Sequence, residues 1–290
     1  MNRYLVCAGA TLFAFATVTS ASLAASTDGI HFALDQRGGS DRIQAHFRDD
    51  AHGKHDDNWS AGLMPSDLIG LEVSSFRGSG TRPIRFAIVR DAGRLDCAGS
   101  GGKQHATGNC RFSDNPAFTQ LLVSRGIGRP TEGQSFGLMA VNARRDLIEA
   151  VAAARYPAPT IDDLMALSAL GVDGAYISQM ASIGYRPRSI ETLIQFKALG
   201  ITPQWLAGFV RVGYANVPGD GLMQIRALGI TPEFIAGYQR IGYRNLPVHT
   251  LVQLKALNIT PEFVRSTVGP RAPLPPVDEL VQIKLFGKRR

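Results

Sequence analysis

The chain has 290 residues, of which 44% are hydrophobic and 19% are charged. These values exclude a globally disordered chain and leave room for one large or two ordinary domains. The formal net charge of +7 favours anionic partners such as acidic proteins, lipid headgroups, cell-wall polymers or nucleic acid, although a basic protein without such a partner can carry the same charge.

The first 24 residues have the composition of a secretory signal peptide. A positive n-region (Asn2–Arg3) precedes an apolar stretch (Tyr4–Val18) and a small-x-small site that ends at Ala24. We expect cleavage after Ala24, or alternatively after Ala25. No later segment offers the roughly 20 apolar residues of a membrane-spanning helix. The mature protein is therefore predicted to be exported, to the periplasm or alternatively to the medium, without a transmembrane segment, and export disfavours nucleic acid as a partner.

Residues 26–112 are predicted to form a small antiparallel β domain, sandwich-like or built as a curved sheet. Apolar and polar residues alternate in three runs, Ile30–Leu34, Ile43–Phe47 and Ile84–Val89. Turn-forming residues lie between the runs, at 37–40, 78–80 and 91–93. Roughly six or seven short strands fit this length.

Two cysteines, Cys97 and Cys110, remain after removal of the signal peptide. They flank a turn-rich run, and a hairpin centred between Lys103 and Gln104 would place them opposite each other at a spacing compatible with a disulfide. An even number of cysteines in an exported protein points the same way. The competing interpretation, a metal-binding pair, has only His105 nearby as a further ligand.

The stretch from His46 to Asp57 contains three histidines and four aspartates in twelve residues. Imidazole and carboxylate groups suit zinc or copper, so one hypothesis is a metal-dependent enzyme that uses this loop. The spacing matches no defined helical metal motif, however, and the included glycine and lysine favour a solvated hairpin loop. His31, His105 and His249 stand alone and are expected to be surface or capping residues.

From residue 113 to 286 the sequence repeats every 29 residues, which gives six rows. The rows begin at Ser113, Asn142, Gly171, Gly200, Gly229 and Asn258. Two of the clearest read GITPQWLAGFVRVGYANVPGDGLMQIRAL and GITPEFIAGYQRIGYRNLPVHTLVQLKAL. A period of this length is typical of solenoids and arrays.

Each row is predicted to contain two helices. Threonine–proline pairs, as at Thr231–Pro232, supply an N-cap and a first-turn proline, and Glu233 and Glu262 add first-turn carboxylates. Glycines then follow where a helix needs a left-handed terminating residue, at Gly184, Gly213 and Gly242 for the first helix and at Gly171, Gly200, Gly229 and Asn258 for the second. One helical hairpin cannot bury both faces, so we expect an α+β protein whose β domain is followed by an α-solenoid of six stacked hairpins.

Two columns of residues recur from row to row and are candidate binding residues. The first is basic, and we expect it to line up along the stack: Lys197, Arg226, Lys255 and Lys284. Its alternative explanation is that a cation in the last turn of a helix complements the helix dipole. The second is aromatic and follows the terminating glycine of the first helix: Tyr156, Tyr185, Tyr214 and Tyr243. These tyrosines serve either packing or, with arginine, peptide recognition in a groove.

The unit G-[IV]-T-P-[EQ]-[FW]-[IL]…G-Y…L-x-x-[LIF]-[KR]-A-L resembles helical repeats in many exported bacterial proteins. It is also similar to repeats that follow the membrane metallopeptidase domain of beta-lactamase-regulator-type sensor proteins. The resemblance covers residues 115 to about 284, and Arg90–Gly93 and Asn115–Pro116 share it less securely. It implies helical repeats; the peptidase role does not carry over because the chain has no His-Glu-x-x-His sequence.

The sequence contains no recognisable catalytic constellation, and we expect no cofactor and no metal. The first hypothesis is a non-catalytic exported module that binds an acidic protein or other envelope macromolecule through the solenoid. The second, implied by the resemblance alone, is an accessory or sensory component of envelope stress or antibiotic-resistance signalling. Residues 287–290 are expected to form a basic tail.

Overall fold

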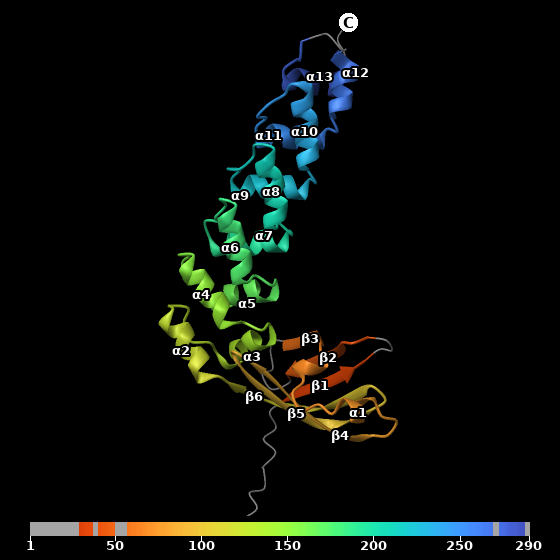
Figure 1. Ribbon diagram of the computed structural model, residues 1–290, viewed down its shortest axis with the longest axis vertical. Helices are drawn as coiled ribbons and strands as arrows, with labels where there is room; N and C mark the ends of the chain where they lie inside the picture. Colours follow the sequence, from red (N-terminus) through yellow and green to blue (C-terminus); the bar gives the residue numbers. More distant parts are fainter. Residues whose placement is uncertain (1–28, 37–39, 50–56, 269–272, 288–290) are drawn as a thin grey trace, which may run out of the picture.

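The computed structural model describes residues 29–36, 40–49, 57–268 and 273–287. The predicted signal peptide, most of the loop between His46 and Asp57 and the last three residues of the basic tail lie outside these ranges. The described chain is an antiparallel β-sheet followed by a column of helices, so the predicted α+β class is confirmed (Figure 1). No described helix combines the length and apolar character needed to cross a membrane.

Six strands form the sheet, in the spatial order β3-β2-β1-β6-β5-β4, and all neighbours are antiparallel. Their bounds are Ile30–Asp35 (β1), Ile43–Asp49 (β2), Asp57–Leu63 (β3), Arg82–Arg90 (β4), Gly93–Gly102 (β5) and His105–Asp114 (β6). A 3-10 turn (η1, Pro65–Asp67) and the short helix α1 (Val73–Arg77) connect β3 to β4. β6 therefore runs two residues past the expected end of the β domain at residue 112.

The sheet is strongly curled. Phe32 of β1 and Phe86 of β4 pack edge to face with ring centroids 5.0 Å apart, whereas a flat sheet would separate these strands by three spacings, about 14 Å. Glycines allow the paired strands β5 and β6 to approach closely enough for this curl. A Cβ on Gly99 would lie 2.0 Å from the Thr107 carbonyl oxygen, and a Cβ on Gly108 would lie 2.3 Å from the Ala98 carbonyl oxygen, so no larger residue fits at either place. The described strands thus form one curved sheet and not two separate sheets of a sandwich.

The predicted disulfide is confirmed. Cys97 and Cys110 are directly opposed in β5 and β6, are bonded to each other and have Cα atoms 4.0 Å apart. The hairpin turns at Lys103 and Gln104, which have φ of 55° and 65°, the conformation that a two-residue hairpin turn matched to strand twist requires. The two sulfurs lie in the core of the sheet, since both cysteines are buried.

Twelve helices follow the sheet in the described part of the chain, and we call them the helical array. The first helices of the rows are α2 (Pro116–Ser124), α4 (Arg145–Ala153), α6 (Gly174–Ser182), α8 (Pro203–Arg211), α10 (Pro232–Ile241) and α12 (Pro261–Val268). The second helices are α3 (Glu132–Ala140), α5 (Ile161–Ala169), α7 (Ile190–Ala198), α9 (Gly219–Ala227), α11 (Val248–Ala256) and α13 (Val277–Phe286). Each set begins anew every 29 residues, as the sequence period predicts.

The predicted helix boundaries are confirmed by hydrogen bonds and backbone angles. The hydroxyls of Thr202 and Thr231 accept from the backbone N–H of Trp205 and Phe234, at 3.1 and 3.2 Å. All the terminating residues have positive φ, from 49° to 109°: Gly171, Gly184, Gly200, Gly213, Gly229, Gly242 and Asn258. The first-turn carboxylates of Glu233 and Glu262 have a pKa below the usual value, mainly because each accepts a hydrogen bond from its own backbone N–H.

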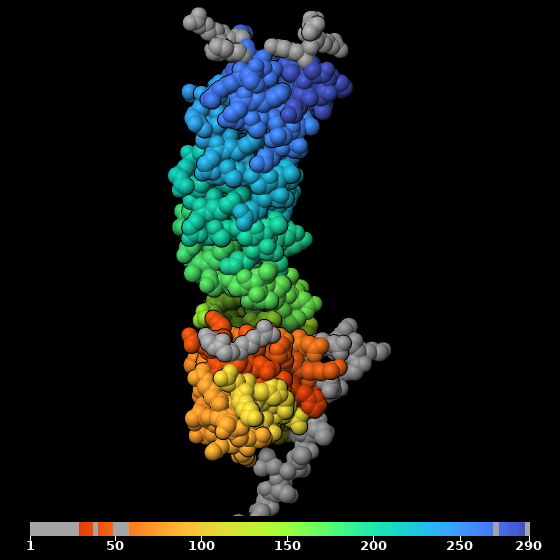
Figure 2. Space-filling view, turned by 90° about the vertical axis from the view of Figure 1, so that its right-hand side faces the viewer, coloured from red at the N-terminus to blue at the C-terminus, as the bar shows by residue number. Residues whose placement is uncertain are grey.

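The helices form two layers. First helices contact first helices of the next row, as in α4–α6, α6–α8 and α10–α12, and second helices do the same in α3–α5, α5–α7 and α9–α11. Apolar side chains fill the space between the layers, among them Leu193, Phe196, Leu222, Ile225 and Leu251, each at most 1% exposed. The result is an elongated column that extends away from the sheet, with α12 and α13 at its far end (Figures 1 and 2).

Three residues at strand ends join the sheet to the array. The Asn115 side chain donates to the Asp91 carbonyl oxygen (2.9 Å) and caps α2 by accepting from the Ala117 N–H (3.1 Å). The Asp91 carboxylate accepts from the backbone N–H of Arg145, the first residue of α4, at 2.8 Å. Arg90 donates to the carbonyl oxygens of Met139 and Ala140 at the end of α3, at 2.7 and 2.6 Å. The first two rows of the array are thereby fixed to the β4–β5 turn.

Candidate functional site

Each cation of the predicted basic column lies over an aromatic ring of its own row. The pairs are Lys197 over Tyr176 (4.5 Å from the cation to the ring centroid), Arg226 over Trp205 (5.7 Å), Lys255 over Phe234 (5.2 Å) and Lys284 over Phe263 (4.7 Å). The offset within every pair is 21 residues. We call these four pairs the cation–ring column; such contacts each contribute about 0.5–1 kcal/mol when they are exposed to solvent.

The same cations also stand in the last turn of a second helix, where the helix dipole favours positive charge. Arg226 additionally donates to the carbonyl oxygen of Leu199, at the C-terminus of the preceding second helix, at 2.8 Å. These contacts give the column a structural role within the array. Arg226 and Lys284 remain exposed, so their partner-binding role stays a prediction.

The tyrosine column follows the left-handed glycine that ends each first helix. The N–H groups of Tyr185, Tyr214 and Tyr243 donate back to carbonyls five residues earlier, at 2.9–3.1 Å, and thereby close the helix ends. The hydroxyls of Tyr214 and Tyr243 donate to the carbonyl oxygens of Leu246 and Pro275, at 2.6 and 2.5 Å, in each case 32 residues further on. These two tyrosines therefore tie one row to the next, as the packing interpretation expects.

The two columns lie at opposite ends of the first helices. Lys197 contacts Tyr176 in the first turn of α6, whereas Tyr185 follows the last turn of that helix. A nine-residue helix is about 13 Å long, so the two columns do not form one groove. The basic residues beside the tyrosines are instead four exposed arginines: Arg155, Arg186, Arg188 and Arg244. We call these arginines together with Tyr156, Tyr185, Tyr214 and Tyr243 the tyrosine edge.

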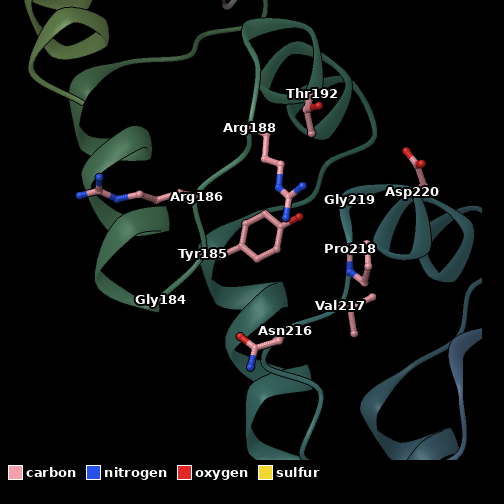
Figure 3. Close-up of a pocket in the computed structure, with 10 residues that line it drawn as sticks. All are labelled: Gly184, Tyr185, Arg186, Arg188, Thr192, Asn216, Val217, Pro218, Gly219 and Asp220. Atoms are coloured by element: carbon pink, nitrogen blue, oxygen red, sulfur yellow. The ribbon is translucent and has the colours of Figure 1, made fainter. Parts of the chain in front are cut away.

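Two pockets adjoin each other at the tyrosine edge and share Tyr185, Arg186 and Arg188. The larger, of about 490 Å³, extends to the start of α9 and includes Asn216 and Asp220. The smaller, of about 260 Å³, extends to Tyr156. Figure 3 shows the guanidinium of Arg188 beside the hydroxyl of Tyr185, while Arg186 points away from the other labelled side chains. Both pockets are lined by charged and aromatic side chains together.

Tyr185 differs from its counterparts in the next two rows. Its ring stacks on Phe196 with centroids 5.5 Å apart, but its hydroxyl makes no hydrogen bond to another described residue. Partial burial raises the pKa of Tyr185. Arg188 has a smaller effect that lowers this pKa, and Asp220 has a smaller effect that raises it further. The phenol is therefore neutral at physiological pH and available as a hydrogen-bond donor.

Only part of the histidine-rich stretch belongs to the described residues. His46 lies on β2, where its Nδ1 is 2.8 Å from the Ser60 hydroxyl on β3, and Asp49 pairs with Asp57 across the same hairpin. His52 and His55 lie outside the described residues. Within the described ranges, no three His, Cys, Asp or Glu side chains gather as metal ligands, and the metal hypothesis stays untested.

Two features of the candidate site were not predicted from the sequence. The first is the aromatic half of the cation–ring column, which the constant 21-residue offset could have revealed. The second is Arg188. Its column across the six rows is otherwise apolar, with Pro130, Pro159, Val217, Leu246 and Pro275 at the corresponding places. Val217 is buried, whereas Arg188 is exposed and lines a pocket.

Comparisons with protein-family models, with curated proteins and with solved structures each found no match.

Proposed function

We propose that this protein is a non-catalytic, exported interaction module in which six helical hairpins form an α-solenoid that binds an acidic protein partner. The regular spacing of the helices and the contacts within each layer support the solenoid. Stacked repeats of this kind offer long surfaces for binding. The disulfide between Cys97 and Cys110 supports an oxidising compartment.

The tyrosine edge is the observation that carries the proposal. It places arginine next to tyrosine in the second, third and fifth rows. Both residue types are enriched in protein interfaces, whereas lysine is depleted. None of its four arginines forms an ion pair with a carboxylate among the described residues, in contrast to Arg125, which pairs with Glu149 at 2.6 Å. Unpaired guanidinium groups favour a partner that supplies carboxylates.

Capture from envelope extract with the full chain as bait tests this function. One variant bait carries Arg186→Glu with Arg244→Glu at the tyrosine edge. A matched bait carries Arg82→Glu with Arg85→Glu on β4, where both side chains are exposed; the change in net charge is the same. We expect an acidic protein that is retained by the wild-type and β4 baits and lost from the tyrosine-edge bait. Equal loss from both variant baits would show a non-specific charge effect and refute the proposal.

A further inference from the structure

The larger pocket at the tyrosine edge combines two donors that have no acceptor among the described residues. They are the guanidinium of Arg188 and the hydroxyl of Tyr185, which lie beside each other (Figure 3). The next two rows lack this arrangement. Where Arg188 stands, the next two rows have Val217 and Leu246, and the hydroxyls of Tyr214 and Tyr243 are already bonded to carbonyl oxygens.

The start of α9 adds to the positive potential of the pocket. Its N-cap, Pro218, supplies no side-chain acceptor, and Gly219 and Asp220 of the first turn line the pocket. The N-terminal end of a helix favours negative charge. Together with the Arg188 guanidinium, it makes the pocket suited to an anion.

The charges that line the pocket limit the kind of anion. Arg188 contributes one positive charge beside Tyr185 and Asp220 one negative charge at the start of α9, whereas the Arg186 side chain points away from both (Figure 3). A monoanion balances the charge of the Arg188 guanidinium, whereas a phosphate dianion would exceed it and would also be repelled by the Asp220 carboxylate. A planar guanidinium also matches the two oxygens of a carboxylate in a bidentate pair.

We infer that this pocket is a carboxylate-binding site, in which Arg188 and the Tyr185 hydroxyl hold an aspartate or glutamate side chain of a polypeptide partner. The inference rests on the proposed function, because it names the point at which the acidic partner is anchored. Asn216 also lines the pocket, but its side chain lies apart from Arg188 and the Tyr185 hydroxyl and points away from them (Figure 3). The tyrosine edge thus has one specific anchor, in the third and fourth rows, and a weaker electrostatic surface on either side.

Fluorescence anisotropy of an end-capped tetraglutamate peptide with a neutral dye tests the site on the full chain. The variant Arg188→Val installs the side chain that the next row has at this place, so it is compatible with the fold. We expect it to weaken peptide binding about 10-fold or more, as for loss of a charge-assisted hydrogen bond. Tyr185→Phe should weaken binding about 2- to 10-fold, and Arg85→Val on β4, which removes the same charge, should change it less than about 2-fold.

Three further results would overturn the site. They are equal effects of Arg188→Val and Arg85→Val, equal binding of a tetraglutamine peptide, and displacement of the peptide by inorganic phosphate at lower concentration than by acetate. The capture experiment separates the two proposals. If Arg188→Val leaves peptide binding intact while the tyrosine-edge bait still loses its partner, the carboxylate site fails and the proposed function stands. If Arg188→Val weakens peptide binding as expected while the tyrosine-edge bait still retains the partner, the carboxylate site stands and the proposed function fails.

Discussion

Arg90 lies over the indole ring of Trp59, 4.8 Å from its centroid, although the two residues stand on β4 and β3 at opposite edges of the sheet order. The curl of the sheet brings its two edges together at this point. Phe47 stacks on the same indole with centroids 4.6 Å apart. Because Arg90 also binds the last carbonyls of α3, one guanidinium joins both sheet edges to the helical array.

We expect Arg90→Ala to lower the free energy of unfolding by about 2–4 kcal/mol, since it removes two hydrogen bonds from a charged donor and one cation–ring contact. Burial lowers the pKa of Arg90, which reflects its desolvated position. Arg85→Ala, on the exposed side of the same strand, should change stability by less than about 0.5 kcal/mol. Urea unfolding of the two variants checks this; similar small losses would show that Arg90 does not join the parts.

Removal of the disulfide should destabilise the sheet. The two cysteines are 13 residues apart in sequence, and closing a loop of this size contributes about 3 kcal/mol in the chain-entropy account. We therefore expect Cys97→Ala with Cys110→Ala to lower the urea midpoint clearly. Reducing agent should lower the wild-type midpoint to a similar degree and leave the variant unchanged. A midpoint for the wild type that does not respond to full reduction would contradict this assignment.

The contribution of the tyrosine hydroxyl to the free energy of unfolding should differ from row to row. Tyr214→Phe and Tyr243→Phe each lose a hydrogen bond to the next row, and we expect each to cost about 0.5–1.5 kcal/mol. Tyr185→Phe should cost almost nothing, because its hydroxyl has no such acceptor. Thermal or urea unfolding of the three variants provides the comparison. Equal losses at all three positions would show that Tyr185 also ties its row to the next.

Alkaline pH should destabilise the array through Tyr176. Burial, with a smaller effect of Tyr156, raises the pKa of Tyr176 to about 12, and its hydroxyl donates to the Ile201 carbonyl oxygen at 2.7 Å. A phenol whose pKa is higher in the folded state contributes stability that is complete below the unfolded pKa of about 10 and is lost as pH rises towards 12.

The loss of stability between pH 10 and 12 should therefore be smaller in Tyr176→Phe than in the wild type. Ultraviolet absorbance of phenolate, followed together with circular dichroism, measures both quantities. If Tyr176 ionised near pH 10 without any loss of structure, its burial would not be coupled to folding.

The helices could be predicted from the sequence because their boundaries depend on local chemistry. Thr231 caps a helix through an N–H three residues away, and Gly242 ends one because its own φ is positive. The 29-residue period then carries a boundary found in one row to all the others. The Cys97–Cys110 pair was predictable for the same reason, since it depends on a single two-residue turn.

The curl of the sheet and the carboxylate site could not be predicted in the same way. From the sequence alone, Gly99 and Gly108 indicate only weak strand propensity. Their role in the close approach of two strands requires knowledge of their cross-strand neighbours. The contact between Arg90 and Trp59 joins residues 31 positions apart through a sheet edge that only the fold creates. Arg188 does interrupt an apolar column of the repeat. Its proposed role in binding a carboxylate, however, depends on the free hydroxyl of Tyr185 beside it (Figure 3).

The central claim, that the array binds an acidic partner through the tyrosine edge, is tested most directly by the affinity of a purified captured partner for matched variants. The wild-type chain is compared with Arg186→Glu/Arg244→Glu and with Arg82→Glu/Arg85→Glu at the same salt concentration. We predict at least a 10-fold weaker Kd for the first variant and less than about a 3-fold change for the second. Equal Kd values for the two variants would contradict the claim.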